Sequence, residues 1–96
     1  MARYRVIHWN DIPSLVEAVE GDQVVRIPLS QRFQDLIDAV AMREGAAEAD
    51  AYLEGWGQSP ARERFGSAKD VAEQVAAALE GDFPRLIAQR VQAPPP

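Results

Sequence analysis

Alternating apolar and polar side chains mark the first third of the chain and predict β-structure. Residues 4–10 are rich in β-branched and aromatic side chains, a composition typical of strands. Residues 14–20 and 23–29 flank the dipeptide Gly21-Asp22, which favours a two-residue hairpin loop. We therefore expect three consecutive antiparallel strands, the second and third joined by a tight turn.

The side chains of the predicted hairpin indicate its register. Pairing outward from the Gly21-Asp22 loop places Glu17 opposite Arg26, an opposite-charge pair. The same pairing gathers apolar residues on one face, namely Val16, Ala18, Val25, Ile27 and Leu29. Because a slip of one residue would turn this apolar set outward, the pattern favours a single register.

Helical periodicity begins after Ser30. Behind this predicted N-cap, apolar residues recur at three- and four-residue steps, at Phe33, Leu36, Ile37, Val40 and Ala41. A second amphipathic stretch follows the predicted cap Ser67, with its apolar residues at Val71, Val75, Ala78 and Leu79 and with Ala72 and Ala76 beside them. Gly45 and Gly81 are placed to end these two helices, and Asp82-Phe83-Pro84 opens a third, shorter helix.

The segment between the two main helices is expected to hold a fourth strand. Residues 51–56, AYLEGW, alternate so that Tyr52, Glu54 and Trp56 share one face, and residues 57–66 are predicted to form a loop. The order β-β-β-α-β-α predicts an α+β two-layer sandwich, with a mostly antiparallel sheet and both main helices on one face. The other face is then left to solvent or to a partner.

Length and composition narrow the class of protein. The 96 residues suit one domain, which we assign to residues 1–92, with 93–96 as a disordered Pro-rich tail. A net charge of −5 argues against a nucleic-acid partner, and the absence of Cys excludes disulfides, thiolate catalysis and zinc fingers. No apolar run is long enough for a membrane span and no signal segment is evident, so we expect a soluble cytoplasmic protein.

The stretch from His8 to Pro13, HWNDIP, holds the single His of the chain and invites a catalytic interpretation. His8 would be a general base oriented by Asp11, but residues three apart at a strand end tend to point to opposite faces. We therefore interpret the stretch as a strand end and a turn that present Trp9. Asp35 and Asp38 lie on a helix flank without the spacing of a calcium loop, so no metal site and no cofactor are predicted.

Two binding surfaces and one mode of self-association remain open from the residues alone. The first is a protein-binding surface with aromatic anchors and a polar rim. Its anchors are Trp9, Tyr52 and Trp56, and its rim is Asp11, Arg43 and Glu54. The second is an anion site formed by Arg62, Arg64 and Ser67 at the start of the second helix. Self-association to a homo-oligomer would use the uncovered sheet face or the edge of the first strand.

Three stretches, taken in order, resemble the bacterial virulence factor domain family. They are His8 to Pro13; Arg32-Phe33-Gln34 with Ile37-Asp38 and Ala41 to Gly45; and Asp50 to Leu53 with Trp56. The resemblance extends over residues 3–91, and the chain departs from it at His8, where Tyr is more usual. The same domain also occurs within the conserved virulence factor C proteins.

The resemblance implies an accessory protein, with no catalytic residues to carry over and an association with cobalamin-dependent methyl transfer or one-carbon metabolism. Together with the residues, it leads us to predict a non-enzymatic accessory domain that binds another protein. The alternative is a small-molecule or anion-binding module that uses residues 57–67.

Overall fold

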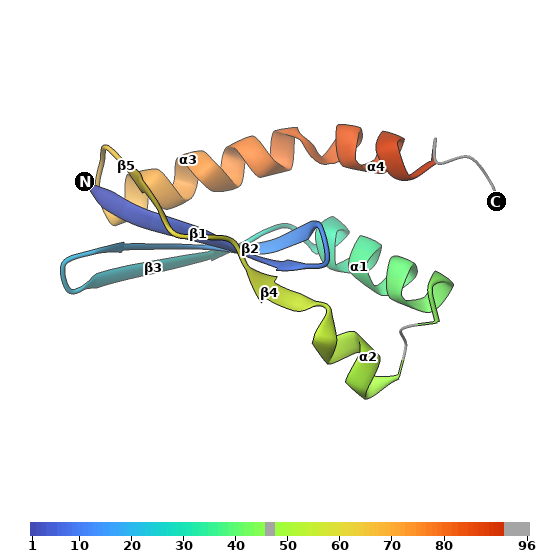
Figure 1. The fold of residues 1–96 in the computed structure, drawn as a ribbon. Helices are drawn as coiled ribbons and strands as arrows, with labels where there is room; N and C mark the ends of the chain where they lie inside the picture. The colour runs from blue at the N-terminus through green and yellow to red at the C-terminus, as the bar shows by residue number, and fades with distance from the viewer. Residues whose placement is uncertain (46–47, 92–96) are drawn as a thin grey trace.

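Figure 1 shows a computed structural model of the chain, which describes residues 1–45 and 48–91, apart from the side chains of residues 90 and 91. The tail predicted at 93–96 lies outside these residues. In chain order the elements are β1 (Ala2–Trp9), β2 (Ile12–Glu20), β3 (Gln23–Pro28), α1 (Gln31–Arg43), α2 (Ala49–Glu54), β4 (Trp56–Gln58), β5 (Arg62–Arg64), α3 (Ala68–Gly81) and α4 (Phe83–Val91). The predicted α+β class is confirmed.

The strands form one antiparallel sheet in the order β3-β2-β1-β4, and β5 also pairs with β1. β1 pairs with β2 along one side and with both β4 and β5 along the other, so it is an interior strand. The expectation that the first strand offers a free edge for self-association is therefore wrong. β3 is the outer strand on one side, because it pairs only with β2, and β4 and β5 are the outer strands on the other side of β1 (Figure 1).

The β2–β3 hairpin has the predicted register. Gly21 takes a φ of +58° in the turn, a conformation that glycine adopts at low cost. Glu17 lies opposite Arg26, with 2.8 Å between Oε2 of the carboxylate and Nε of the guanidinium. The predicted apolar face of the hairpin packs against α3, as expected from its alternation.

Small side chains dominate the contact between α3 and the sheet. We call this buried group the α3 cluster; its members are Ala2, Val16, Ala18, Ala68, Val71, Ala72, Val75 and Ala76. Ser67 caps α3 as predicted, accepting a hydrogen bond from Asp70 N at 3.1 Å. Ala78, expected on the apolar stripe, is exposed instead. Ala72 and Ala76, expected beside the stripe, are buried with Ala68, Val71 and Val75.

A second buried group lies where α1 packs near the β1–β2 turn. We call it the Trp9 cluster; its members are Trp9, Ile12, Ile37, Val40 and Ala41. The α1 residues are those that the helical periodicity predicted, with Phe33 also buried. Gly45 follows α1 with a φ of +72°, and its N–H donates to Met42 O, which confirms it as the stop signal.

The predicted strand over residues 51–56 is wrong. Residues 49–54 form α2, and only Trp56 belongs to a strand, as the first residue of β4. Alternation over six residues is weak evidence, and Ala and Leu at positions 49, 51 and 53 favour a helix. The expected loop over residues 57–66 likewise contains the rest of β4 and all of β5.

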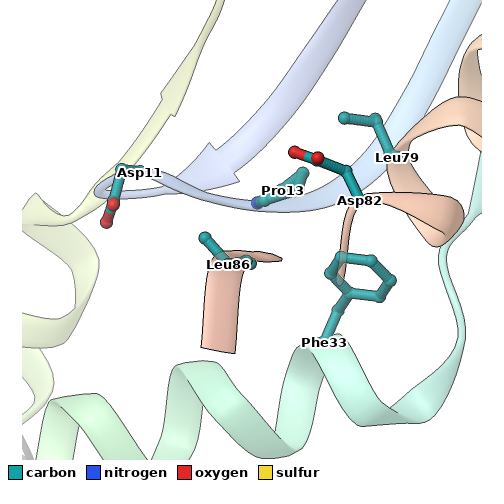
Figure 2. A pocket seen from close by; sticks show the side chains of 6 residues that line it. All are labelled: Asp11, Pro13, Phe33, Leu79, Asp82 and Leu86. Carbon is teal, nitrogen blue, oxygen red and sulfur yellow. The ribbon is translucent and has the colours of Figure 1, made fainter. Parts of the chain in front are cut away.

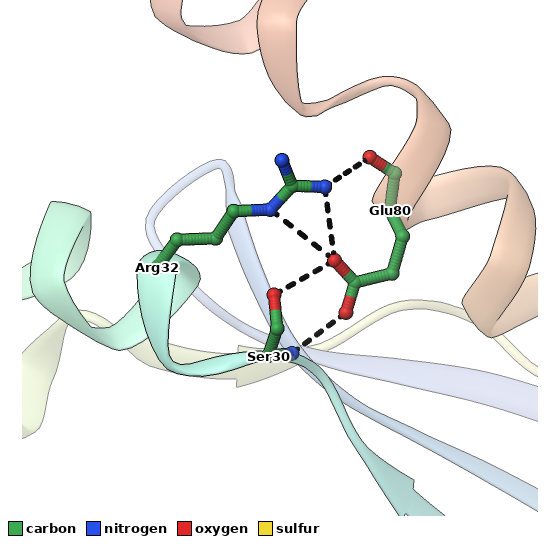
Figure 3. Close-up of polar contacts among 3 residues, drawn as sticks. All are labelled: Ser30, Arg32 and Glu80. Carbon is green, nitrogen blue, oxygen red and sulfur yellow. Dashed lines mark hydrogen bonds and ion pairs between the residues drawn. The ribbon is translucent and has the colours of Figure 1, made fainter.

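One polar junction ties the start of α1 to the end of α3 (Figure 3). Glu80 accepts hydrogen bonds from Ser30 N at 2.7 Å and from the Ser30 hydroxyl at 2.8 Å. Arg32 donates to the Glu80 carboxylate at 3.0 Å and to Glu80 O at 2.6 Å. Ser30 is the N-cap residue of α1 as predicted, but its side chain makes no capping bond, and its hydroxyl donates to Glu80.

Candidate functional site

The three predicted aromatic anchors lie together, but one of them is inside the protein. The Trp9 and Tyr52 rings stack with centroids 5.8 Å apart, and Tyr52 meets Trp56 edge to face at 6.0 Å. Trp9 is only 1% exposed, and its indole Nε1 donates to Tyr52 O at 2.7 Å. Trp9 therefore serves the core, which removes it as a contact for a partner, while Tyr52 and Trp56 are half-buried around it.

The packing of Trp9 explains a glycine in the sequence. A Cβ atom at Gly55 would lie 2.4 Å from Trp9 Nε1, closer than any real contact. Gly55 O also accepts a hydrogen bond from Asn10 N at 2.8 Å, so the α2–β4 joint is fixed to the end of β1. The aromatic group thus holds α2 against the sheet, which is a structural role.

The predicted polar rim is spread over three elements. Asp11 lies in the β1–β2 turn, Arg43 ends α1 and Glu54 ends α2, and all three are exposed. His8, which we interpreted as structural, packs beside Gly57, whose added Cβ would lie 3.2 Å from His8 Cε1. Within the described residues, His8 Nδ1 is buried without a hydrogen-bond partner, and no three His, Asp or Glu side chains are grouped to hold a metal ion.

A small hollow lies beside the β1–β2 turn (Figure 2). It has a volume of about 140 Å³, and its lining residues are Asp11, Pro13, Phe33, Leu79, Asp82 and Leu86. Figure 2 shows the Asp82 carboxylate pointing toward Pro13 and the Asp11 carboxylate pointing away. Its apolar lining residues on helices are Phe33 of α1, Leu79 of α3 and Leu86 of α4. We therefore interpret this hollow as a gap in the packing of the three helices.

A larger hollow of about 230 Å³ lies between α3, β1 and the β4–β5 segment. We call it the Arg62 hollow; its lining residues are Tyr4, Val6, Ser59, Arg62, Val75 and Leu79. Of the predicted anion site, Arg62 lines this hollow, while Arg64 pairs with Ala2 at the far end of β5. The Ser67 oxygen caps α3, and neither Arg64 nor Ser67 is among the residues that line this hollow.

The outer edge of β3 is the second surface with binding potential. Glu20 and Gln23 flank a two-residue loop, so this pair and every second pair beyond it carry the β2–β3 hydrogen bonds. The bond from Leu29 N to Ser14 O, at 2.9 Å, fits this phase. Val24 and Arg26 lie between the bonded pairs, so their backbone N–H and C=O groups point away from β2.

Neither the Arg62 hollow nor the outer edge of β3 was predicted from the sequence, because both depend on the strand order. The register of Val24 and Arg26 followed from the Gly21-Asp22 loop, but β3 could be recognised as an outer strand only once the strand order was known. Ser59 and Tyr4 come together through β4 and β5, which we expected to be a loop. Short strands of three residues carry too little alternation to be predicted.

Comparison with known proteins gives a family and no further relative. No curated protein and no solved structure matches the chain. Over the described residues, no helix is both long and apolar enough to cross a lipid bilayer. The sequence model of the virulence factor family matches residues 7–92, which include both buried clusters except Ala2. The chain therefore belongs to the virulence factor family.

Proposed function

We propose that this protein is a non-enzymatic accessory domain that binds an extended segment of another protein along β3. The observation that carries the proposal is the free β3 edge, where the Val24 and Arg26 backbone groups point outward. An added strand would satisfy these groups with main-chain hydrogen bonds, the mode of recognition known as strand addition. The interaction requires no groove, because an exposed strand is itself a template.

The edge also sets the length of the segment that it can hold. Pro28 occupies the next outward position and has no N–H, so it accepts but does not donate. Productive pairing is thereby centred on residues 24–26. Proline at this position also limits uncontrolled edge-to-edge association, a common protection of outer strands.

The side chains along the outer edge of β3 form a surface that is partly apolar and partly charged. Val24 is 50% exposed on the sheet face opposite α3, and Arg26 beside it is ion-paired with Glu17. An apolar side chain of the bound segment would pack on Val24. The net charge of −5 disfavours association of two copies and attracts a segment that carries basic residues.

A proline substitution tests the backbone groups directly. Val24→Pro removes one outward N–H and leaves the β2–β3 ladder intact, because Val24 does not donate to β2. Val24→Ala is the matched control, since it shortens the side chain and keeps the N–H. Proteins enriched by the tagged wild type from its native host and kept by Val24→Ala, but lost with Val24→Pro, would support strand addition.

Amide hydrogen exchange locates the contact on the strand. The Val24 and Arg26 amides should exchange quickly in the free protein and slowly in the complex with a captured partner. Unchanged exchange at both amides, or full retention of every partner by folded Val24→Pro, would refute the proposal. A dimer that forms through β3 in sedimentation would refute the choice of a different protein as partner. The identity of the partner would also test the association with cobalamin-dependent methyl transfer or one-carbon metabolism.

A further inference from the structure

The Arg62 hollow has one cationic side and one apolar side. Val6 of β1 and Val75 and Leu79 of α3 form its apolar wall, and Arg62 stands at its rim. Its volume of about 230 Å³ is below the range of drug-sized sites, which begins near ~300 Å³. A ligand that fills it must therefore be small.

Strand pairing explains why Arg62 faces the hollow. β5 pairs with β1 so that Arg62 lies opposite Tyr4 and Glu63 lies opposite Arg3. Glu63 turns to the other face and forms an ion pair with Arg3, at 3.6 Å between Oε1 and Nε. Arg62 is left on the α3 side of the sheet, and within the described residues it has neither an ion-pair partner nor a hydrogen-bond acceptor.

Ser59 supplies a fixed polar group beside this cation. Its Oγ accepts a hydrogen bond from Val6 N at 2.8 Å, and its own N–H donates to Val6 O at 2.9 Å. Both bonds hold Ser59 in place and leave its hydroxyl hydrogen available for an acceptor. Tyr4 also lines the hollow, and its side chain carries a hydroxyl that can donate a hydrogen bond.

We propose that the Arg62 hollow binds a small carboxylate with a short apolar body. The carboxylate would accept charge-assisted hydrogen bonds from Arg62, and the apolar body would pack between Val6, Val75 and Leu79. A single arginine on an apolar wall suits a monoanion, whereas a phosphate would bring a second charge without a second cation. This site is independent of the β3 edge and goes beyond the proposed protein-binding function.

Hexanoate is a suitable probe, with hexanol as its uncharged counterpart. Titration into the ¹⁵N-labelled protein should shift the amide signals of Tyr4, Val6, Ser59 and Val75 to saturation. Hexanol should bind at least about tenfold more weakly, because it lacks the charge that Arg62 recognises. Binding should also weaken as salt is added, since part of it is electrostatic.

Two arginine variants separate this site from general attraction to a positive strand. Arg62→Gln should weaken hexanoate binding at least about tenfold. Arg64→Gln removes the same charge from the same strand, but Arg64 does not line the hollow, so hexanoate affinity should change less than about twofold. Arg62 is exposed and unpaired in the described structure, so its variant should keep the fold, as its amide spectrum would show.

Three results would overturn the proposal. One is a linear, non-saturating response to hexanoate at the four amides. Another is equal binding of hexanoate and hexanol, which would leave an apolar hollow without anion recognition. The third is an equal loss with Arg62→Gln and Arg64→Gln, which would show a diffuse charge effect. None of these results bears on the β3 edge, so the two proposals fail separately.

Discussion

The two buried clusters of this domain are built from different kinds of side chain. The α3 cluster contains alanines and valines and no buried aromatic ring, so helix and sheet lie close along a regular interface. The Trp9 cluster is centred on one indole, which also makes a hydrogen bond to the α2 backbone. The difference indicates that many small contacts stabilise the α3 cluster, whereas the Trp9 cluster depends on a single side chain.

The largest predicted effect concerns Trp9. Trp9→Ala removes a side chain that is 1% exposed and its bond to Tyr52 O, so we expect a loss of about 3–5 kcal/mol of unfolding free energy. Trp56→Ala should cost clearly less, because Trp56 is half-buried. Urea denaturation of both variants measures the two losses. Equal losses would show that the cluster does not depend on Trp9.

Gly55 offers a second way to disturb the Trp9 cluster. Gly55→Ala places a Cβ 2.4 Å from Trp9 Nε1, so the ring or the α2–β4 joint must shift, at a cost of about 1–3 kcal/mol. Gly81→Ala is the matched control, because its Cβ would have no atom within 4 Å. Its thermal midpoint should stay level or rise slightly. A Gly55→Ala midpoint as high as wild type would contradict the close packing.

The α3 cluster should be sensitive to added volume on the side of α3 that faces the sheet. Ala72→Leu inserts three carbons into a fully buried contact with the sheet, and we expect it to cost about 1–3 kcal/mol. Ala78→Leu adds the same atoms on the exposed side of α3 and should change stability by less than about 0.5 kcal/mol. Chemical denaturation of the pair decides which alanines face the sheet. Similar costs would contradict the helix orientation.

The elements that could be predicted from the sequence differ from those that could not in how local their pattern is. The β2–β3 hairpin and the stripes of α1 and α3 follow from local alternation and periodicity, because each is a repeated pattern within one segment. α2, β4 and β5 are short and are defined by partners far along the chain. Tyr52 O bonds the Trp9 indole, and Arg62 pairs with Tyr4 on β1. Sequence alone therefore placed Arg62 among the candidates but could not supply Ser59 or Tyr4 beside it.

The smallest predicted effect lies at the junction between the two helices. Hydrogen bonds from Ser30 and the charge of Arg32 hold the pKa of Glu80 below its ordinary value of 4.5, against the opposing effect of desolvation. Ionised Glu80 therefore stabilises the fold fully above about pH 4.5, and this contribution is lost as the pH falls through the folded-state pKa. Glu80 is about one-third exposed, so solvent screens part of its interaction with Arg32.

Glu80→Gln keeps the shape of the side chain and removes its charge. At pH 7 we expect it to cost about 1 kcal/mol, which is about 4–8 °C in thermal midpoint for a domain of this size. The difference from wild type should shrink as the pH is lowered below about 4.5, because protonated Glu80 and Gln are then both neutral. Glu73→Gln, on the exposed side of α3, should stay within about 0.5 kcal/mol of wild type. If the stability difference between Glu80→Gln and wild type instead grows on acidification, the ionised carboxylate destabilises the junction. The α3 cluster and the Trp9 cluster would then be joined by packing alone.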